Sequence, residues 1–370
     1  MKKVLFFIPT LGGGGAEKVL VNLVNGLNRQ KYSVTVMTLF DVGVNRKYLS
    51  NHVEYKSVFK RLFRGNTIFL KLFSPTFLSK KMITSEYDIV VSFLESPTTR
   101  IVAALGDSTK KVQWIHNEYY DKNEILKCYR SEKEFFRLQK MFDNTIHVAK
   151  TVQTGYRRLF PELQLNDEVL YNAIDTRKIR QLADETPEQL DIEREIIKLV
   201  SVGRLVPQKG FTRLVNVMAK LIKEFPYIYL EILGEGELRD KLEEQIKELG
   251  LESYVTLSGY HSNPYAYVKN ADLFVCSSLH EGYSTAVTES LIVGTPVLTT
   301  DCSGMAELLG EQNEYGVIVD NSEDALYEGL RELLENPAKI SHYSEMAKLR
   351  GKSFELSTNI KAVENMLDSL

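Results

Sequence analysis

Short runs of apolar residues alternate along this chain with longer segments in which apolar residues recur at the helical period. That alternation is typical of parallel β-sheets whose strands are joined by crossover helices. Between the first two apolar runs, Glu17 to Arg29 has one apolar face and predicts a helix. In the first half the pattern predicts strands near residues 3–8, 33–39, 52–58, 87–94, 110–115, 144–148 and 167–171.

A second series of strands and helices begins at Ile196. It predicts strands near residues 196–202, 227–233, 254–258, 272–277, 295–299 and 316–319, and helices near 210–224, 236–249, 284–293 and 322–335. Two series in tandem indicate two sheets, and the polar segment from Asp175 to Glu195, which contains Pro187 and has weak periodicity, separates them. We therefore expect domains at 1–175 and 196–345, a linker region at 176–195, and a helical tail at 346–370 that closes the second domain or packs back on the first.

The composition is that of an ordinary globular protein and indicates no particular binding partner. Of the 370 residues, 44% are apolar and 26% are charged, and the formal net charge of -3 gives no reason to expect a nucleic-acid partner. The three cysteines, Cys128, Cys276 and Cys302, lack the spacing of a zinc site or a disulfide framework, so we expect a reducing, cytoplasmic environment. No stretch approaches the roughly 20 apolar residues of a membrane-spanning helix. The basic, then apolar start at 1–9 is interpreted as a first buried strand rather than a signal peptide.

A glycine-rich loop, Gly12-Gly13-Gly14-Gly15-Ala16-Glu17, follows the first predicted strand and opens the first helix. Without side chains, its backbone N–H groups and the helix dipole can approach an anion closely. The spacing is not GxGxxG, and the loop lacks the lysine of a phosphate-binding P-loop. A tight strand-to-helix turn without a ligand is the alternative interpretation.

Two cations follow the first strand of the second series, Arg204 after Gly203 and Lys209 before Gly210. Two fixed positive charges five residues apart suit a diphosphate, because they neutralise both the bound group and the charge of a leaving group. The alternative is a solvated loop with two surface cations.

Two carboxylates bracket the start of a later predicted helix. Ser284 or Thr285 can cap this helix, so Glu281 would lie just outside its positive end and Glu289 about a turn inside it. Carboxylates in such positions can accept paired hydrogen bonds from sugar hydroxyls. Taken singly, each glutamate is more often a surface residue, so the prediction depends on their joint placement.

His116 ends a predicted strand of the first series, where ligand-binding residues of α/β sheets gather. A lone histidine is more often a structural hydrogen-bonding group, and that alternative stays open.

The segment 56–85 carries seven cations and no anion. Interleaved aromatic and aliphatic residues, which look exposed in the sequence, favour a surface that rests on an anionic membrane. The alternative is a pair of helices whose apolar residues enter the core. The cations are Lys56, Lys60, Arg61, Arg64, Lys71, Lys80 and Lys81, and the apolar residues are Phe59, Leu62, Phe63, Ile68, Phe69, Leu70, Leu72, Phe73, Phe77 and Leu78.

Taken in order, these motifs resemble the retaining glycosyltransferases of family 4. The resemblance runs along the whole chain through the GGGGAE loop, His116, the GRLVPQKG segment, the LGEGEL turn at Leu233 to Leu238, and the pair Glu281-x7-Glu289. It implies a GT-B fold, in which two doubly wound, Rossmann-like α/β domains face each other across a cleft.

The resemblance also implies residue roles. Arg204 and Lys209 would hold the donor diphosphate, Glu281 would contact the transferred sugar, Glu289 the nucleotide ribose, and His116 would lie beside the reacting sugar. The remaining nucleotide-binding positions would be Gly14, Gly15, Gly203, Gly234, Gly282, Tyr283, Ser284 and Thr285, several of them through backbone amides.

The function so implied is metal-independent transfer of a hexose or N-acetylhexosamine, because Arg204 and Lys209 replace a metal and no DxD pair ends a suitable strand. We expect no obligatory cofactor, a UDP-sugar donor with GDP still open, and a glycan or lipid-linked sugar acceptor at the inner membrane face, as in capsule or other surface polysaccharide biosynthesis. The rivals are a nucleotide-sugar epimerase or hydrolase of the same fold and a non-catalytic, sugar-nucleotide-binding assembly subunit. A nicotinamide-dependent dehydrogenase is disfavoured by the failed dinucleotide spacing.

Two segments depart from the commoner family pattern. Gly282-Tyr283-Ser284 stands where Gly-Phe-Gly is frequent, and Tyr171-Asn172-Ala173-Ile174-Asp175 stands where Pro-Asn-Gly-x-Asp is frequent. The backbone roles are kept, whereas the contacts to the donor sugar are left open.

Overall fold

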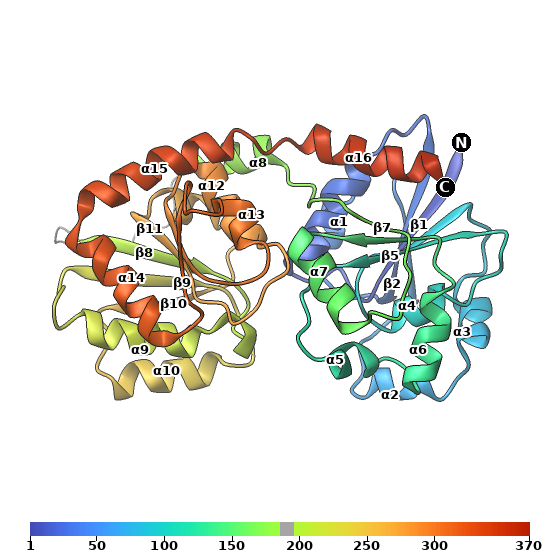
Figure 1. Ribbon diagram of the computed structural model, residues 1–370, viewed down its shortest axis with the longest axis horizontal. Helices are drawn as coiled ribbons and strands as arrows, with labels where there is room; N and C mark the ends of the chain where they lie inside the picture. The colour runs from blue at the N-terminus through green and yellow to red at the C-terminus, as the bar shows by residue number, and fades with distance from the viewer. Residues whose placement is uncertain (186–195) are drawn as a thin grey trace. The chain divides into compact units, whose positions relative to one another are not determined.

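The computed structural model describes residues 1–185 and 196–370 (Figure 1). The described chain divides into two compact units. Unit 1 comprises Met1–Ile174 and Leu356–Leu370, and unit 2 comprises Asp175–Glu355. Each unit is built on one parallel sheet covered by helices.

The sheet of unit 1 has the strand order β3-β2-β1-β4-β5-β6-β7, with every pair parallel. In β1, every residue from Val4 to Ile8 is buried, as expected for a strand covered on both faces. The strands are β1 (Lys2–Ile8), β2 (Tyr32–Phe40), β3 (Glu54–Phe59), β4 (Ile89–Ser92), β5 (Lys110–Ile115), β6 (Asn144–His147) and β7 (Asp167–Val169).

Helices connect these strands, and α16 adds the end of the chain to unit 1. One core cluster joins β1, β2 and β4 to α3 and α4 through Phe7, Met37, Leu78, Ile101 and Val102. The helices are α1 (Gly15–Gly26), η1 (Val44–Tyr48), α2 (Asn66–Lys71), α3 (Pro75–Met82), α4 (Pro97–Val102), α5 (Lys122–Leu126), α6 (Glu132–Gln139), α7 (Lys150–Leu159) and α16 (Leu356–Ser369).

The sheet of unit 2 has the strand order β10-β9-β8-β11-β12-β13, again with every pair parallel. Its strands are β8 (Ile197–Val202), β9 (Ile228–Leu233), β10 (Val255–Gly259), β11 (Leu273–Cys276), β12 (Val297–Thr300) and β13 (Val317–Val319). Its helices are α8 (Thr176–Ala183), η2 (Pro207–Lys209), α9 (Phe211–Leu221), α10 (Arg239–Glu248), α11 (Tyr265–Lys269), α12 (Thr285–Val293), α13 (Met305–Leu309), α14 (Glu323–Glu335) and α15 (Pro337–Gly351).

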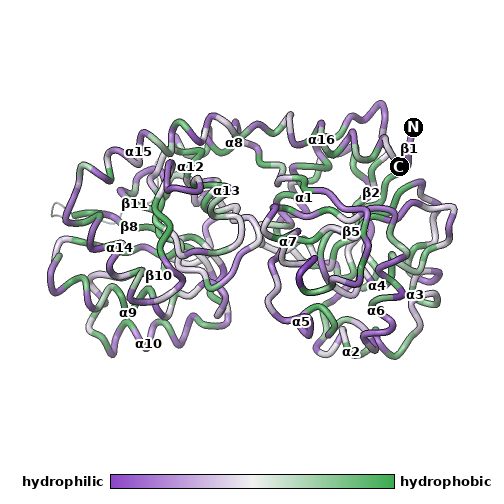
Figure 2. The backbone as a smooth tube through the Cα atoms, in the orientation of Figure 1, coloured by the Kyte–Doolittle hydropathy of each residue, from purple (hydrophilic) through white to green (hydrophobic). Residues whose placement is uncertain are grey.

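The helices of unit 2 lie on both faces of its sheet. One core cluster packs α9, α10 and α14 against the strands through residues such as Leu214, Met218, Leu242 and Leu330. On these outer helices, hydrophilic and hydrophobic positions alternate along the tube, as expected when only one side of a helix is buried (Figure 2).

Every strand range predicted from the hydrophobic pattern overlaps a strand of the described chain. Helix α8 occupies Thr176–Ala183, the first part of the segment 176–195 that was predicted as a linker region. The Asp175 side chain caps α8 by accepting from the Lys178 amide at 3.0 Å, and Ile179 and Ala183 are buried. Residues 186–195 of the predicted linker, with Pro187, lie outside the described residues.

The predicted tail at 346–370 divides between the two units at Leu356. Helix α15 belongs to unit 2, whereas α16 belongs to unit 1, where Val363 and Leu367 are buried. The Tyr32 hydroxyl donates to Asp368 at 2.5 Å, and the Asn28 amide donates to Glu364 at 2.8 Å. The last helix is therefore an integral part of unit 1.

Strand order reverses once in each sheet, between β1 and β4 in unit 1 and between β8 and β11 in unit 2. At such a point the connections leave in opposite directions, which opens a crevice at the carboxyl ends of the two strands where ligands bind. The loops after β1, β4, β8 and β11 are therefore the places to look for a site. Within the described residues, no helix combines the length and apolarity needed to cross a membrane.

Candidate active site

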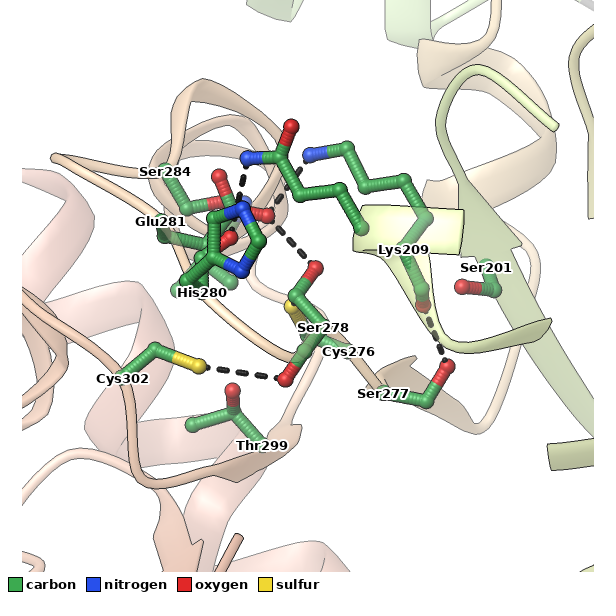
Figure 3. A network of polar contacts seen from close by, with 12 residues as sticks. Ser201, Lys209, Cys276, Ser277, Ser278, His280, Glu281, Ser284, Thr299 and Cys302 are labelled. Carbon is green, nitrogen blue, oxygen red and sulfur yellow. Dashed lines mark hydrogen bonds and ion pairs between the residues drawn. The ribbon is translucent and has the colours of Figure 1, made fainter. Parts of the chain in front are cut away.

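At the reversal point of unit 2, a lysine, a serine and a glutamate meet around one oxygen atom (Figure 3). Lys209 Nζ donates to Glu281 Oε1 at 2.6 Å, and Ser278 Oγ donates to the same oxygen at 2.5 Å. Lys209 comes from the connection after β8, and the other two come from the loop after β11. Among the described residues no donor bonds Glu281 Oε2, so this second oxygen can accept from a ligand hydroxyl.

The charge state of this pair follows from its surroundings. Burial lowers the pKa of Lys209, but the Glu281 carboxylate more than offsets that effect, so the pKa is raised overall. Lys209 therefore carries a positive charge throughout the neutral pH range. Among the described residues, Lys209 forms an ion pair with Glu281 alone. Its ammonium group can therefore also bind an anionic ligand.

Gly210 allows this close approach. Gly210 follows η2 with φ of +65°, and a Cβ atom there would collide with the carbonyl of Ser277. The Lys209 side chain lies along Gly203, where a Cβ would be 3.4 Å from three of its carbons. The GRLVPQKG segment thus has glycine where the loop after β11 needs space, whereas a Cβ at Gly203 would make only ordinary van der Waals contact with the lysine stem.

Arg213 of α9 fixes the loop after β11 through hydrogen bonds to its backbone. Arg213 donates through Nε and Nη2 to the Ser277 carbonyl at 2.9 and 2.6 Å, and through Nη2 to the Ser278 carbonyl at 2.7 Å. The Sγ atom of Cys302 donates to the same Ser278 carbonyl at 3.1 Å (Figure 3). These bonds hold the backbone from which the Ser278 hydroxyl reaches Glu281.

Helix α12 begins at Thr285, four residues after Glu281, and its positive N-terminal end adjoins this loop. Ser284 is its N-cap and accepts from the Val287 amide at 3.4 Å, as predicted for Ser284 or Thr285. Glu289 lies inside the helix, is buried, and receives the Tyr265 hydroxyl at 3.4 Å. Gly282 and Tyr283 are buried in the turn between Glu281 and the cap.

Two further predicted residues lie at the same edge of the sheet. Arg204 is exposed and close enough to Lys209 to oppose its positive charge. Gly234 has φ of +151°, and a Cβ there would collide with the carbonyl of Gly203. The loops after β8 and β9 therefore approach each other through glycine backbone, while the Arg204 side chain extends into solvent.

His116, in unit 1, follows β5 and is 8% exposed. Its ring packs against Phe93 and Trp114 at centroid distances of 4.8 and 6.3 Å. Burial lowers the pKa of this imidazole to about 3, so the ring is neutral, and its Nε2 atom has no hydrogen-bond partner among the described residues. A neutral imidazole with one unused nitrogen can accept a hydrogen bond from a substrate hydroxyl.

The glycine-rich loop of unit 1 follows β1, and α1 begins at Gly15 with Gly14 as its N-cap. The Glu17 side chain folds back so closely over Gly14 that a Cβ at that position would collide with it. A carboxylate therefore already lies at this helix N-terminus. Anion binding by the Gly14 and Gly15 amides stays a prediction, and it requires Glu17 to move.

The segment 56–85 is less exposed than its sequence suggested. Leu70 and Leu78 are buried, and Phe59, Phe63 and Phe73 pack against the core, so half of the predicted apolar surface is interior. Lys56 pairs with Glu54 at 3.1 Å. The apolar residues that remain exposed are Leu62, Ile68, Phe69, Leu72 and Phe77.

Comparison with known proteins identifies the family. Residues 183–350 match the model described as "Glycosyl transferases group 1", and residues 13–178 match the model described as "Glycosyltransferase Family 4". An N-acetylgalactosamine-N,N'-diacetylbacillosaminyl-diphospho-undecaprenol 4-alpha-N-acetylgalactosaminyltransferase of Campylobacter jejuni is 31% identical over 366 residues, which cover 96% of each chain. The chain belongs to the family 4 glycosyltransferases.

Other relatives of this glycosyltransferase agree in class and in fold. The lipopolysaccharide core biosynthesis glycosyltransferase LpsD of Rhizobium meliloti is 26% identical over 337 residues, covering 88% of this chain and 86% of LpsD. The crystal structure of Anabaena HepE in complex with UDP and glucose superimposes with a TM-score of 0.77 at 18% identity, covering all of both chains. The two parallel sheets and this likeness show the GT-B fold.

Several residues of this glycosyltransferase site were not singled out from the sequence. Ser278 and Arg213 organise Glu281 and its loop, and Tyr265 contacts Glu289. The position of Ser278 just after an apolar strand was a usable signal, since polar residues at strand ends gather at the ligand edge. The sequence pattern gave no such signal for Arg213, which lies within α9, or for Tyr265, which begins α11.

Across the described residues, no group of three or more His, Cys, Asp and Glu side chains is arranged to hold a metal ion. Metal independence remains a prediction that depends on Arg204 and Lys209.

Proposed function

We propose that this glycosyltransferase moves a hexose or N-acetylhexosamine from a UDP-sugar to a sugar acceptor, with retention of anomeric configuration and without an obligatory metal. The observation that carries the proposal is the contact of Lys209 and Ser278 with one oxygen of Glu281, beside the capped start of α12. A cation, a helix N-terminus and a carboxylate with one free oxygen match a diphosphate joined to a hydroxylated ring.

In this proposal unit 2 binds the donor and unit 1 binds the acceptor. Lys209, Arg204 and the amides at the start of α12 hold the diphosphate, Glu281 Oε2 accepts from a hydroxyl of the transferred sugar, and Glu289 accepts from the ribose. When the bond from the sugar to the diphosphate breaks, negative charge grows on the departing phosphate. Fixed positive groups stabilise that charge more than they stabilise the intact donor, which accelerates transfer. UDP as the nucleotide is supported by its presence in the HepE complexes.

Lys209→Ala tests the donor assignment. We expect turnover to fall roughly 10²- to 10³-fold, the usual loss when one group aimed at developing charge is removed. Lys241→Ala, at an exposed position of α10, is the matched control and should retain wild-type turnover. Kinetics of Lys209→Ala within a few-fold of wild type would falsify the assignment. Products formed with donor alone and with donor plus acceptor distinguish transfer from hydrolysis or epimerisation.

For the acceptor we propose a lipid-linked sugar used in surface polysaccharide assembly, which would place the enzyme in the cytoplasm at the inner membrane face. The names of two Campylobacter jejuni relatives specify undecaprenol-diphosphate acceptors, and that of LpsD specifies lipopolysaccharide core synthesis. Such acceptors present their sugars at a membrane surface, so the enzyme must work there.

The surface we propose to rest on the membrane is formed by α2, α3 and the loop before them. Its five exposed apolar residues, Leu62, Ile68, Phe69, Leu72 and Phe77, lie among exposed cations and no acidic residue of the segment. Two arginines donate hydrogen bonds to the backbone carbonyls at the end of α2. Arg100 donates to Leu70 and Phe73. Arg130 donates to Lys71 and Leu72. Because these carbonyls are already bonded, the segment can leave water without exposing unpaired backbone groups.

Vesicle flotation with anionic phospholipids checks this surface. The wild-type enzyme should bind at low salt and lose most of its binding at high salt, since the electrostatic part is screened. The double variant Ile68→Ser/Leu72→Ser should bind less at every salt concentration, whereas Leu349→Ser, at another exposed leucine, should behave as wild type. Absence of salt-sensitive binding by the wild-type enzyme would remove the proposal.

A further inference from the structure

A partly exposed glutamate with one buried carboxyl oxygen lies at the reversal point of the sheet in unit 1. Glu95 follows β4, the strand beside β1 at which the strand order reverses, and stands just before Ser96, the cap of α4. Strand β4 pairs on its other side with β5, which leads into His116. Glu95 therefore lies at the edge where an α/β sheet binds ligands, and the donor assignment above does not use it.

The Glu95 carboxylate crosses from the β4 loop to the β5 loop and binds two successive backbone amides. Its Oε1 atom accepts from the His116 amide at 2.8 Å and from the Asn117 amide at 3.1 Å. Two consecutive N–H groups turned toward one oxygen form a small anion-binding concavity, and here the anion is a side chain of the same chain. The carboxylate thus closes the turn that carries the His116 imidazole.

A second contact from the same loop fixes the ring itself. Phe93, two residues before Glu95, packs on the His116 ring, with the two centroids 4.8 Å apart. The β4 loop therefore holds both the backbone and the side chain of His116. A shift of Glu95 would therefore be transmitted to the imidazole through the turn whose amides it accepts from.

The second carboxyl oxygen of Glu95, Oε2, does not take part in an ion pair among the described residues. Oε2 is buried and forms no hydrogen bond in the described part of the chain, although the nearby Tyr119 hydroxyl helps to hold the pKa of the carboxyl down. No Lys or Arg side chain there pairs with Glu95. Burying an unpaired carboxylate costs free energy that a leucine at this position would not. An acidic group with a buried, unbonded oxygen at a ligand-binding edge is better explained by a positioning role than by stability.

We infer that Glu95 is a positioning residue for sugar transfer, whose carboxylate holds the His116–Asn117 turn so that the imidazole is set for the acceptor. The activity part of this inference rests on the proposed function, in which unit 1 binds the acceptor. The geometric part does not, since it concerns only the bonds between two loops of one unit.

The test compares two substitutions of Glu95 in the full-length enzyme. Glu95→Leu removes both accepting bonds, and kcat/KM for the acceptor should fall about 10- to 100-fold, the range for a reacting group displaced by about 1 Å. The Kd for UDP should stay within about twofold, because the donor residues lie in unit 2. Glu95→Gln keeps an accepting oxygen and should restore most of the acceptor kcat/KM. Glu124→Leu, at an exposed position of α5, is the matched control.

Ring resonances of His116 give a readout that is independent of activity. The chain has six histidines, so labelled imidazoles can be assigned by comparison with His116→Gln. Glu95→Leu should shift the His116 resonances, and Glu95→Gln should leave them near the wild-type positions. If Glu95→Leu does not fold, Glu95→Asp, which keeps the charge but is one methylene shorter, replaces it with the same expectations.

Two results would overturn the inference. Wild-type acceptor kinetics and unmoved His116 resonances in Glu95→Leu would show that the turn does not need the carboxylate. Equal damage by Glu95→Gln and Glu95→Leu would show that the negative charge acts directly. If the wild-type enzyme transferred no sugar, the proposed function would fail, while the resonances would still decide the role of Glu95.

Discussion

At the scale of single residues, the two oxygens of Glu281 have different tasks. Oε1 receives both Lys209 and Ser278, so the plane of the carboxylate is fixed, whereas Oε2 is left for a ligand. A carboxylate held by one donor can rotate about its side-chain torsions, and a second donor on the same oxygen restricts that rotation. Ser278 should therefore influence how well Glu281 holds the donor sugar.

Ser278→Ala is predicted to lower kcat/KM for the donor about 10-fold, because a hydrogen bond to a charged group contributes about 1.5–3 kcal/mol and part of it is recovered by rearrangement. Steady-state kinetics with varied donor measures this. The matched control is Ser344→Ala in α15, which also loses one hydrogen bond, to the Gly294 carbonyl, but should keep wild-type kinetics. An unchanged Ser278→Ala enzyme would mean that Lys209 alone orients Glu281.

Glu95 also predicts a pH dependence of stability. Burial raises the pKa of its carboxyl to about 7, although the backbone amides of Glu95 itself, Asn117 and His116 and the nearby Tyr119 hydroxyl oppose the shift. In the unfolded chain the proton leaves near the ordinary value of 4.5, so between pH 4.5 and 7 a rise in pH favours unfolding. Glu95→Gln does not titrate and should not lose this stability.

Chemical denaturation at several pH values tests this expectation. The free energy of unfolding of Glu95→Gln should gain on the order of 2 kcal/mol relative to wild type between pH 4.5 and 7.5. Parallel curves for the two proteins would contradict the raised pKa.

The residues that we propose to bind the donor were singled out from the sequence because they follow strands. Arg204, Lys209 and Glu281 stand at strand ends in a distinctive spacing, which predicted that they share one edge, and Lys209 and Glu281 do meet there. Ser278, Arg213 and Glu95 act through hydrogen bonds to partners far away in the chain. Such pairings depend on which loops the topology brings together, and local sequence does not encode that.

At the scale of elements, buried strands were easier to predict than short helices. A strand covered on both faces is a continuous apolar run, as in β1 and β11. Helices such as α4 and α5 have only six and five residues, too few to display a helical period. Helix α8 was missed although Ile179 and Ala183 lie on one buried face, because charged residues surround them.

The packing of α16 on unit 1 leads to a prediction at this scale. Leu367 is fully buried, so Leu367→Ala should lower the stability of the enzyme by about 2–4 kcal/mol through lost burial and the cavity left behind. Thermal or chemical denaturation measures the change. Leu349→Ala, at a leucine that is 55% exposed on α15, should stay within about 0.5 kcal/mol of wild type. Equal stabilities of the two variants would show that α16 does not contribute to the core of unit 1.

At the scale of the whole molecule, the two units differ in how the chain builds them. Unit 2 is one continuous stretch, whereas unit 1 is assembled from the two ends of the sequence. Both sheets are wound in the same way, with one reversal of strand order, and both have polar side chains at that reversal. Similar sheets thus provide two separate edges, one with Lys209 and Glu281 and one with Glu95 and His116.

The division of unit 1 between the two ends of the chain has a consequence during synthesis on the ribosome. The residues that bind the donor in our proposal all precede Leu356, whereas unit 1 is complete only once Leu356–Leu370 has been added. A nascent chain cut short before Leu356 could then fold unit 2 while unit 1, although made first, stays unfinished and open to proteases.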